Sequence, residues 1–214
     1  MDRVTFETED GVVLEGEIRL PDGEPRAPSV ICHPHPDFGG SKDHPLLWAI
    51  RNELAARRFA VLSFNFRGVM GSGGAHGGGV DEVKDVRAAI GRIRRAAAGY
   101  VFVSGWSFGA NVALREALDD ERVAALALVA PPMGESRTNL PDLPGPDELG
   151  GFGRPVLLIA GEADPICPAG ELKELDLQLP RATVEVIPGA DHYFSRREGE
   201  VGRMVAQFAE ESVT

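Results

Sequence analysis

Apolar residues occur along the chain in two alternating patterns. Short apolar runs bounded by Gly, Pro or Asp predict strands. Between them, apolar side chains recur every three or four positions, as Leu47, Ile50 and Leu54 do, and such segments predict helices. The predicted strands are 4–8, 12–20, 29–33, 60–64, 100–104, 123–129, 156–160 and 183–187, and the predicted helices include 45–54, 83–93, 107–118 and 201–208.

Strands that alternate with helices predict an α/β fold, in which helices cover both faces of a mostly parallel sheet. The first two strands flank Glu9-Asp10-Gly11, and an Asp-Gly pair favours the tight turn of an antiparallel hairpin. We therefore expect a twisted sheet of about eight strands that starts with an antiparallel hairpin. No repeat or long linker divides the sequence, so residues 1–214 are expected to form a single domain.

Composition narrows the class of protein. Hydrophobic residues make up 43% and charged residues 26%, as in globular proteins, which argues against disorder. With 22 Lys and Arg against 33 Asp and Glu, the net charge is −11, so no binding to nucleic acid or anionic membranes is expected.

No signal peptide or membrane-spanning run is visible, and Cys32 and Cys167 are expected to be reduced thiols. The sequence predicts a cytoplasmic monomer or homodimer.

The segment Gly105-Trp106-Ser107-Phe108-Gly109 follows a predicted strand and opens a predicted helix. A G-x-S-x-G pattern in this position is typical of the sharp turn that presents a nucleophilic serine. The glycines are needed because side chains there would collide with the neighbouring strand and helix. The turn also sets Ser107 at a helix N-terminus, whose partial positive charge favours a developing oxyanion. The alternative is a glycine-rich turn with a capping serine.

A nucleophilic serine requires a base and a carboxylate that orients the base. His192 is the only histidine after Ser107, and it follows the last predicted strand. Asp164 follows the strand before it, and the ends of parallel strands meet at one sheet edge. The order Ser107, Asp164, His192 is the one expected for this turn, so these are the predicted catalytic residues. Glu162 and Asp191 are the rival acids.

Five parts of the sequence form a recognisable set: 33–36 with 39–40, 65–68, 105–109, 161–164 and 191–192. Together these segments resemble the α/β-hydrolase superfamily, and in particular small bacterial serine hydrolases that lack a cap and are related to dienelactone hydrolases and esterases. The resemblance implies an ester hydrolase without a cofactor, whose oxyanion hole is formed by the backbone N–H groups of Phe108 and His35. Dienelactone hydrolases carry cysteine where this chain has Ser107, which argues against that specific activity.

The segment His33-Pro34-His35-Pro36-Asp37 also suggests a metal-dependent hydrolase. Alternate histidines and an aspartate at a strand end are suitable ligands for a metal ion. Phe38, however, stands where such a motif places its next histidine, and few further ligands follow. Further candidate ligands are His44, His76 and Asp164. The preferred interpretation is structural, with no metal.

The glycine-rich segment 71–79 precedes a predicted helix and resembles a phosphate-binding loop only loosely. It lacks the Lys-Ser/Thr pair of such loops, so a flexible loop at the rim of the site is the preferred interpretation. Arg67 is expected to make structural hydrogen bonds at a strand end. Candidate walls of a substrate pocket are Phe38, Trp106, Met133 and Phe194.

The sequence therefore predicts a serine hydrolase that acts on a small ester, thioester or lactone. The alternative from another class is a non-catalytic binding module with the same fold. The stretch 131–155 is rich in Pro and Gly and has no helical periodicity, so it is expected to form a lip rather than a cap domain. A shallow site of this kind favours short acyl chains.

Overall fold

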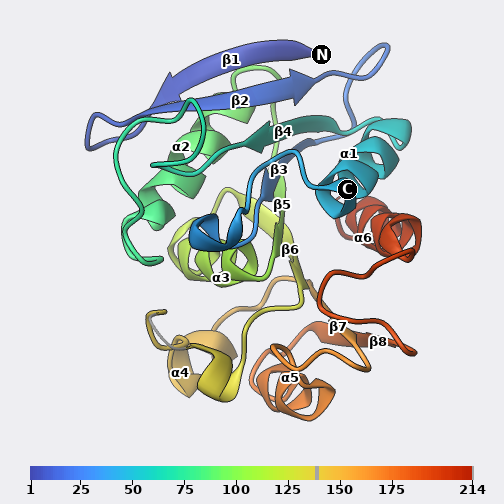
Figure 1. Ribbon diagram of the computed structural model, residues 1–214. Helices are drawn as coiled ribbons and strands as arrows, with labels where there is room; N and C mark the ends of the chain where they lie inside the picture. The colour runs from blue at the N-terminus through green and yellow to red at the C-terminus, as the bar shows by residue number, and fades with distance from the viewer. Residues whose placement is uncertain (138–139, 214) are drawn as a thin grey trace.

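The computed structural model of the protein describes residues 1–137 and 140–213 and contains a sheet of eight strands (Figure 1). The spatial order is β1-β2-β4-β3-β5-β6-β7-β8, and all pairs from β4 to β8 are parallel. β1 and β2 form the expected antiparallel hairpin, and β2 also runs antiparallel to β4. The strands are β1 (Asp2–Glu7), β2 (Val13–Arg19), β3 (Pro28–Cys32), β4 (Ala60–Phe64), β5 (Val101–Trp106), β6 (Val123–Val129), β7 (Val156–Gly161) and β8 (Ala182–Ile187).

Helices cover both faces of the sheet, as predicted (Figure 1). α1 and α6 lie side by side on one face, and α2 and α3 lie together on the other. Gly202 of α6 permits the close approach to α1, because a Cβ there would lie 2.9 Å from the carbonyl carbon of Ala49. The helices are α1 (Pro45–Ala56), α2 (Glu82–Ile93), α3 (Phe108–Asp119), α4 (Pro146–Gly150), α5 (Ala169–Asp176) and α6 (Glu198–Ser212), with 3₁₀ turns η1 (Pro36–Phe38) and η2 (Gly134–Arg137).

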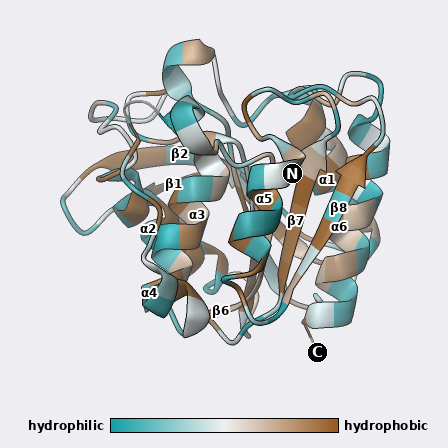
Figure 2. Cartoon of the chain, turned by 90° about the horizontal axis from the view of Figure 1, so that it is seen from below, coloured by the Kyte–Doolittle hydropathy of each residue, from teal (hydrophilic) through white to brown (hydrophobic). Residues whose placement is uncertain are grey.

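The burial of each strand explains whether its sequence is a continuous apolar run. Every residue of β3, β4 and β5 is buried, because helices cover these central strands on both sides. In the edge strand β8, exposed residues alternate with partly buried ones. The hydropathy colouring shows the same arrangement, with apolar strands between helices whose outer faces are polar (Figure 2).

Four short elements were not predicted from the sequence: η1, η2, α4 and α5. α5 buries only Leu172 and Leu175, which is too short an apolar pattern to indicate a helix. In the stretch 131–155, residues 138–139 lie outside the described residues, and the described remainder holds η2 and the five-residue α4. No cap domain is built from these described parts of the connection. Among the described residues no helix is long and apolar enough to cross a membrane.

The parallel strands deliver four loops to one edge of the sheet. Cys32, at the end of β3, pairs with Gly105 of β5, so the segment after β3 leaves the sheet beside the turn at Ser107. The loops after β7 and β8 emerge at the same edge, since β7 pairs with β8 up to Gly161 and Ile187. Residues far apart in the sequence therefore meet there.

Candidate active site

Ser107 lies in the tight turn between β5 and α3, with φ 55° and ψ −120°. Residues other than glycine rarely adopt this backbone conformation, and it persists only where the surrounding structure enforces it. A Cβ at Gly105 would lie 2.3 Å from the carbonyl oxygen of Gly109, and one at Gly109 would lie 2.5 Å from that of Cys32. Glycine at both positions is therefore required for the turn that presents Ser107.

Ser107, His192 and Asp164 form a chain of hydrogen bonds. Ser107 Oγ lies 3.0 Å from His192 Nε2, and His192 Nδ1 lies 2.8 Å from Asp164 Oδ2. A proton on Nδ1 that is donated to the carboxylate leaves Nε2 as the acceptor for the serine hydroxyl. All three residues are buried, so little water competes for these bonds. The arrangement can withdraw a proton from Ser107.

Asp164 is oriented by the backbone that follows it. Its Oδ1 accepts hydrogen bonds from the amides of Ile166 and Cys167, at 2.8 and 3.0 Å. The other carboxylate oxygen is thereby turned towards His192. Cys167 is free and buried, and burial raises the pKa of its thiol.

The rival acids hold the loops instead of contacting the imidazole. Glu162 accepts the amide of Gly189 at 2.8 Å, which joins the loops after β7 and β8. Asp191 accepts the amides of Tyr193 and Ser195, both at 3.1 Å, and these bonds hold its pKa below the usual value. The hydrogen-bond geometry therefore favours Asp164 as the partner of His192.

The backbone amides of Phe108 and His35 belong to neighbouring segments at the same end of the sheet. Phe108 is the first residue of α3, where a helix leaves its N–H groups unsatisfied. In the described part of the chain, neither this amide nor that of His35 donates a hydrogen bond. The rings of His35 and Phe108 lie 5.1 Å apart, so the segment after β3 packs directly against the start of α3.

Comparison with known proteins agrees with this arrangement. A family model described as an alpha/beta hydrolase domain matches residues 30–213. The chain belongs to the alpha/beta hydrolase family. The resemblance inferred from the sequence motifs is thus confirmed.

Several known proteins resemble this hydrolase over most of their length. An uncharacterized protein of Rickettsia prowazekii is 27% identical over 193 residues, 86% of this chain and 79% of that protein. An alpha-beta serine hydrolase homologue from Coxiella burnetii is 28% identical, with a TM-score of 0.84 over 96% of each chain. A serine hydrolase without lid from Xanthomonas campestris, at 24% identity and a TM-score of 0.83 over 99% and 94% of the two chains, shares the fold. So does an esterase from Pyrococcus furiosus, at 20% identity and a TM-score of 0.84 over 100% and 93%.

His33 serves the hydrolase as a buried structural residue. Its Nδ1 donates to the carbonyl oxygen of Pro34 at 2.7 Å, and its Nε2 accepts the amide of Phe66 at 3.0 Å. Burial lowers the pKa of the imidazole to about 4. Both nitrogens are occupied, so His33 is not oriented to bind a metal.

Of the other candidate metal ligands, the structure brings together His35, Asp37 and His76, whose ligand atoms lie within 4.8 Å of one another. His35 Nδ1 accepts the amide of Asp37 at 3.2 Å, which places the proton of the neutral ring on Nε2. His44 lies apart from this group: its Nδ1 accepts the amide of Leu46 at the start of α1, and its ring packs 4.4 Å from Trp106.

The candidate pocket residues differ in exposure. Trp106, Met133 and Phe194 are buried, and the Trp106 indole donates to the carbonyl oxygen of His192 at 3.2 Å. Phe38 is 85% exposed and packs its ring against His35. Tyr193, which the sequence did not single out, is 56% exposed and lies against the rings of Trp106 and His192. The signal available in the sequence was an aromatic residue directly after the candidate catalytic histidine.

Proposed function

We propose that this hydrolase cleaves a small carboxylic ester, or a related thioester or lactone, through an acyl-enzyme on Ser107. The observation that carries the proposal is the hydrogen-bonded chain from Ser107 Oγ through His192 to Asp164, at 3.0 and 2.8 Å. The esterase from Pyrococcus furiosus, which shares the fold, supports the choice of an ester bond.

In the acylation step, Ser107 Oγ forms a bond to the substrate carbonyl carbon while its proton moves to His192 Nε2. Asp164 holds the imidazole in the required tautomer and stabilises the cation that forms. The amides of Phe108 and His35 donate to the negative oxygen. His192 then gives its proton to the leaving oxygen as the bond from carbon to that oxygen breaks.

Deacylation repeats these steps with water. His192 takes a proton from a water molecule, whose oxygen attacks the acyl carbon, and the proton then returns to Ser107 as the acid is released. The chain's own residues supply every proton transfer, so the proposal includes no cofactor. We further propose a small free substrate, because the net charge of −11 disfavours anionic macromolecules. The proposed enzyme is cytoplasmic and acts as a monomer or homodimer.

A fluorophosphonate probe with mass spectrometry of the labelled peptide tests the proposal. We expect labelling of Ser107 alone, and Ser107→Ala should lose both labelling and roughly 10⁵-fold or more in kcat for p-nitrophenyl acetate. Ser195→Ala is the matched control, because this exposed serine lies near the histidine but bonds to Asp191. A folded wild-type protein that is neither labelled nor active would instead support a non-catalytic binding module.

A further inference from the structure

The glycine-rich segment 71–79 has no part in the proposed reaction, yet a buried carboxylate fixes it firmly. Glu82, at the start of α2, has no exposed surface. Its carboxylate accepts hydrogen bonds from His76 Nδ1 at 2.7 Å and from the backbone amides of Gly77 and Gly79 at 2.7 and 2.8 Å. The amides that a phosphate-binding loop would offer to a ligand are therefore occupied by Glu82. The segment is anchored, in contrast to the flexible loop expected from the sequence.

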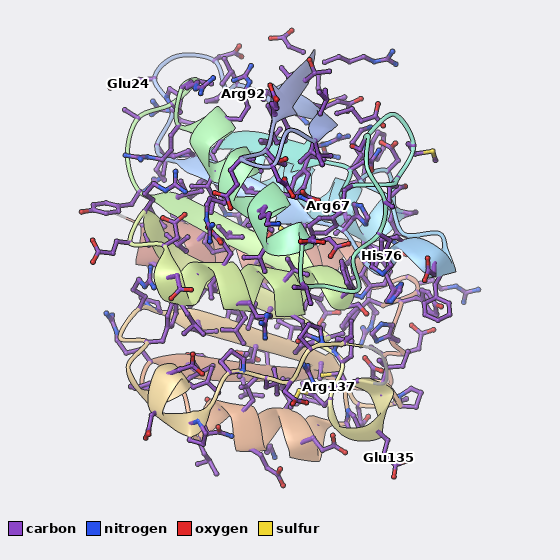
Figure 3. The ribbon with its side chains drawn as sticks, turned by 90° about the vertical axis from the view of Figure 1, so that its left-hand side faces the viewer. Glu24, Arg67, His76, Arg92, Glu135 and Arg137 are labelled. Atoms are coloured by element: carbon purple, nitrogen blue, oxygen red, sulfur yellow. The ribbon has the colours of Figure 1, made fainter. Side chains whose placement is uncertain are left out.

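This anchor sets the position of His76, which Figure 3 shows near the end of the molecule that carries η1. The His76 ring lies 4.9 Å from that of His35, at 65° between planes, and 5.2 Å from that of Phe108, at 62°. His35 and Phe108 also contact each other at 5.1 Å. Three rings thus meet in edge-on and tilted contacts that are favourable for aromatic groups.

His35 and Phe108 are the two residues whose amides would stabilise the oxyanion. The amide of Phe108 is fixed by α3, whereas that of His35 belongs to a loop whose middle is closed by local hydrogen bonds, such as those from Phe38 and Gly40 to the carbonyl oxygen of His35. The two ends of this loop are tied to the segment after β4, because His33 accepts a hydrogen bond from the amide of Phe66 and the amide of Lys42 donates to Asn65 Oδ1. This loop doubles back tightly, since a Cβ at Gly40 would lie 2.1 Å from the carbonyl oxygen of Pro34. Between its two tied ends, this loop meets α3 through the ring of His35, and His76 packs against that ring and against Phe108.

We propose that His76, held by Glu82, is a positioning residue for the oxyanion hole. It fixes the loop that carries His35 against Phe108, so that both amides point to one oxygen. The proposal extends the proposed function, on which it rests. Because donors to an oxyanion contribute more in the transition state than in the substrate complex, a displaced His35 amide should lower kcat more than it raises KM.

The variant His76→Asn separates the packing of the His76 ring from its hydrogen bond to Glu82. Its side-chain amide can still donate to Glu82, so the buried carboxylate keeps a partner while the ring is lost. His76→Phe is the converse, since it keeps a ring against His35 and Phe108. Glu15→Gln is the control: Glu15 also holds the glycine-rich segment, through the amide of Gly71 at 3.0 Å, but it contacts neither ring. Glu15 also accepts a hydrogen bond from Asn65, whose Oδ1 accepts the amide of Lys42, so the comparison is confined to residues 33–40.

The first measurement is hydrogen–deuterium exchange of peptides that cover 33–40, which needs no substrate. His76→Asn should speed their exchange about 10-fold or more, because the local hydrogen bonds of the loop open more often. His76→Phe should stay within about threefold of wild type, and so should Glu15→Gln. Unchanged exchange in His76→Asn would overturn the proposal, as would an equal effect of Glu15→Gln.

The second measurement compares kcat, KM and the inhibition constant of a trifluoromethyl ketone, which forms a tetrahedral adduct with an active serine. His76→Asn should lower kcat by about 10- to 100-fold and weaken the inhibitor by a similar factor, with KM within about threefold. A rise in KM alone would overturn the positioning role. If wild-type protein fails to hydrolyse esters or react with the probe, the proposed function fails, whereas normal hydrolysis with unchanged kcat in His76→Asn rejects only the role of His76.

Discussion

The two sides of the candidate site are built by different means. On the side of the acid and base, loops that follow β7 and β8 are held by backbone amides bound to carboxylates within or between those loops. On the side of the proposed oxyanion hole, side chains link the loop after β3 to distant segments: His33 accepts a hydrogen bond from the amide of Phe66, and the ring of His76 packs on that of His35. The first side is held mainly by its own loops, and the second depends on the surrounding molecule.

This difference predicts how each side fails. A change at Asp164 or His192 should affect the chemistry directly and leave the fold in place, because the loop bonds there are local. A change at His33 or His76 should act through the position or stability of a loop. The following tests separate the two sides, in order of decreasing effect.

The largest effect is expected on the acid–base side. Asp164→Asn should lower kcat by roughly 10⁴, because an amide favours the wrong tautomer of His192. The variant should unfold at nearly the same temperature as wild type, since the side-chain oxygen can still accept the amides of Ile166 and Cys167. Steady-state hydrolysis of p-nitrophenyl acetate and a thermal melt provide both readouts. Asp191→Asn is the control, with an expected loss below about 10-fold; a reversed ranking of the two variants would contradict the assignment of the acid.

On the oxyanion side, acid should destabilise the fold through His33. Its pKa is lowered from 6.5 to about 4 in the folded state, so between these values the unfolded chain binds more protons than the folded one. The stability that neutral His33 contributes is present above pH 6.5 and is lost as the pH falls towards 4. The full pKa shift corresponds to about 3 kcal/mol of the free energy of unfolding.

Urea unfolding of wild type and His33→Gln at several pH values measures this contribution. The glutamine oxygen can accept the amide of Phe66 but does not titrate near these values. On acidification, the free energy of unfolding of wild type should therefore fall more than that of His33→Gln. Parallel pH profiles would show that His33 does not couple protonation to folding.

A smaller effect is expected from the length of the acyl chain. With no cap domain built from the described parts of 131–155, each added methylene should contribute, at up to about 0.8 kcal/mol, only while it is removed from water. We expect kcat/KM for p-nitrophenyl esters to be highest at about two to six carbons and to show no increase above the solubility limit. A maximum for palmitate would reveal an apolar groove beside the site.

The smallest effect should come from chelators. Incubation with EDTA should leave kcat unchanged, because the proposed proton transfers use only Ser107, His192 and Asp164. The same assay with added Zn²⁺ serves as the control. Loss of activity in EDTA that Zn²⁺ restores would favour the metal-dependent alternative, with His35, Asp37 and His76 as the ligands brought together by the fold.

Much of the fold was predictable because its main strands and helices carry regular apolar patterns. The strand at 123–129 has the expected bounds, whereas α5 and η1 bury too few apolar side chains to be found. The contact of Ser107 with His192 was also predictable, since each residue lies in the connection that follows a parallel strand, and these connections leave the sheet at the same edge. The hydrogen bond between His76 and Glu82 could not be predicted. The role proposed for His76 depends on its contacts with the rings of His35 and Phe108, which only the fold brings next to it.

The two outer strands of the sheet, β1 and β8, are the places where another molecule could add a strand. Among the described residues, each of them pairs with one neighbouring strand only, which leaves a row of its backbone groups outside the sheet. Exposed charges interrupt both edges, with Arg3 and Glu7 on β1 and Glu185 on β8. An added strand would have to bury or crowd these charges. We therefore expect the folded protein to resist growth into sheet-linked aggregates at high concentration.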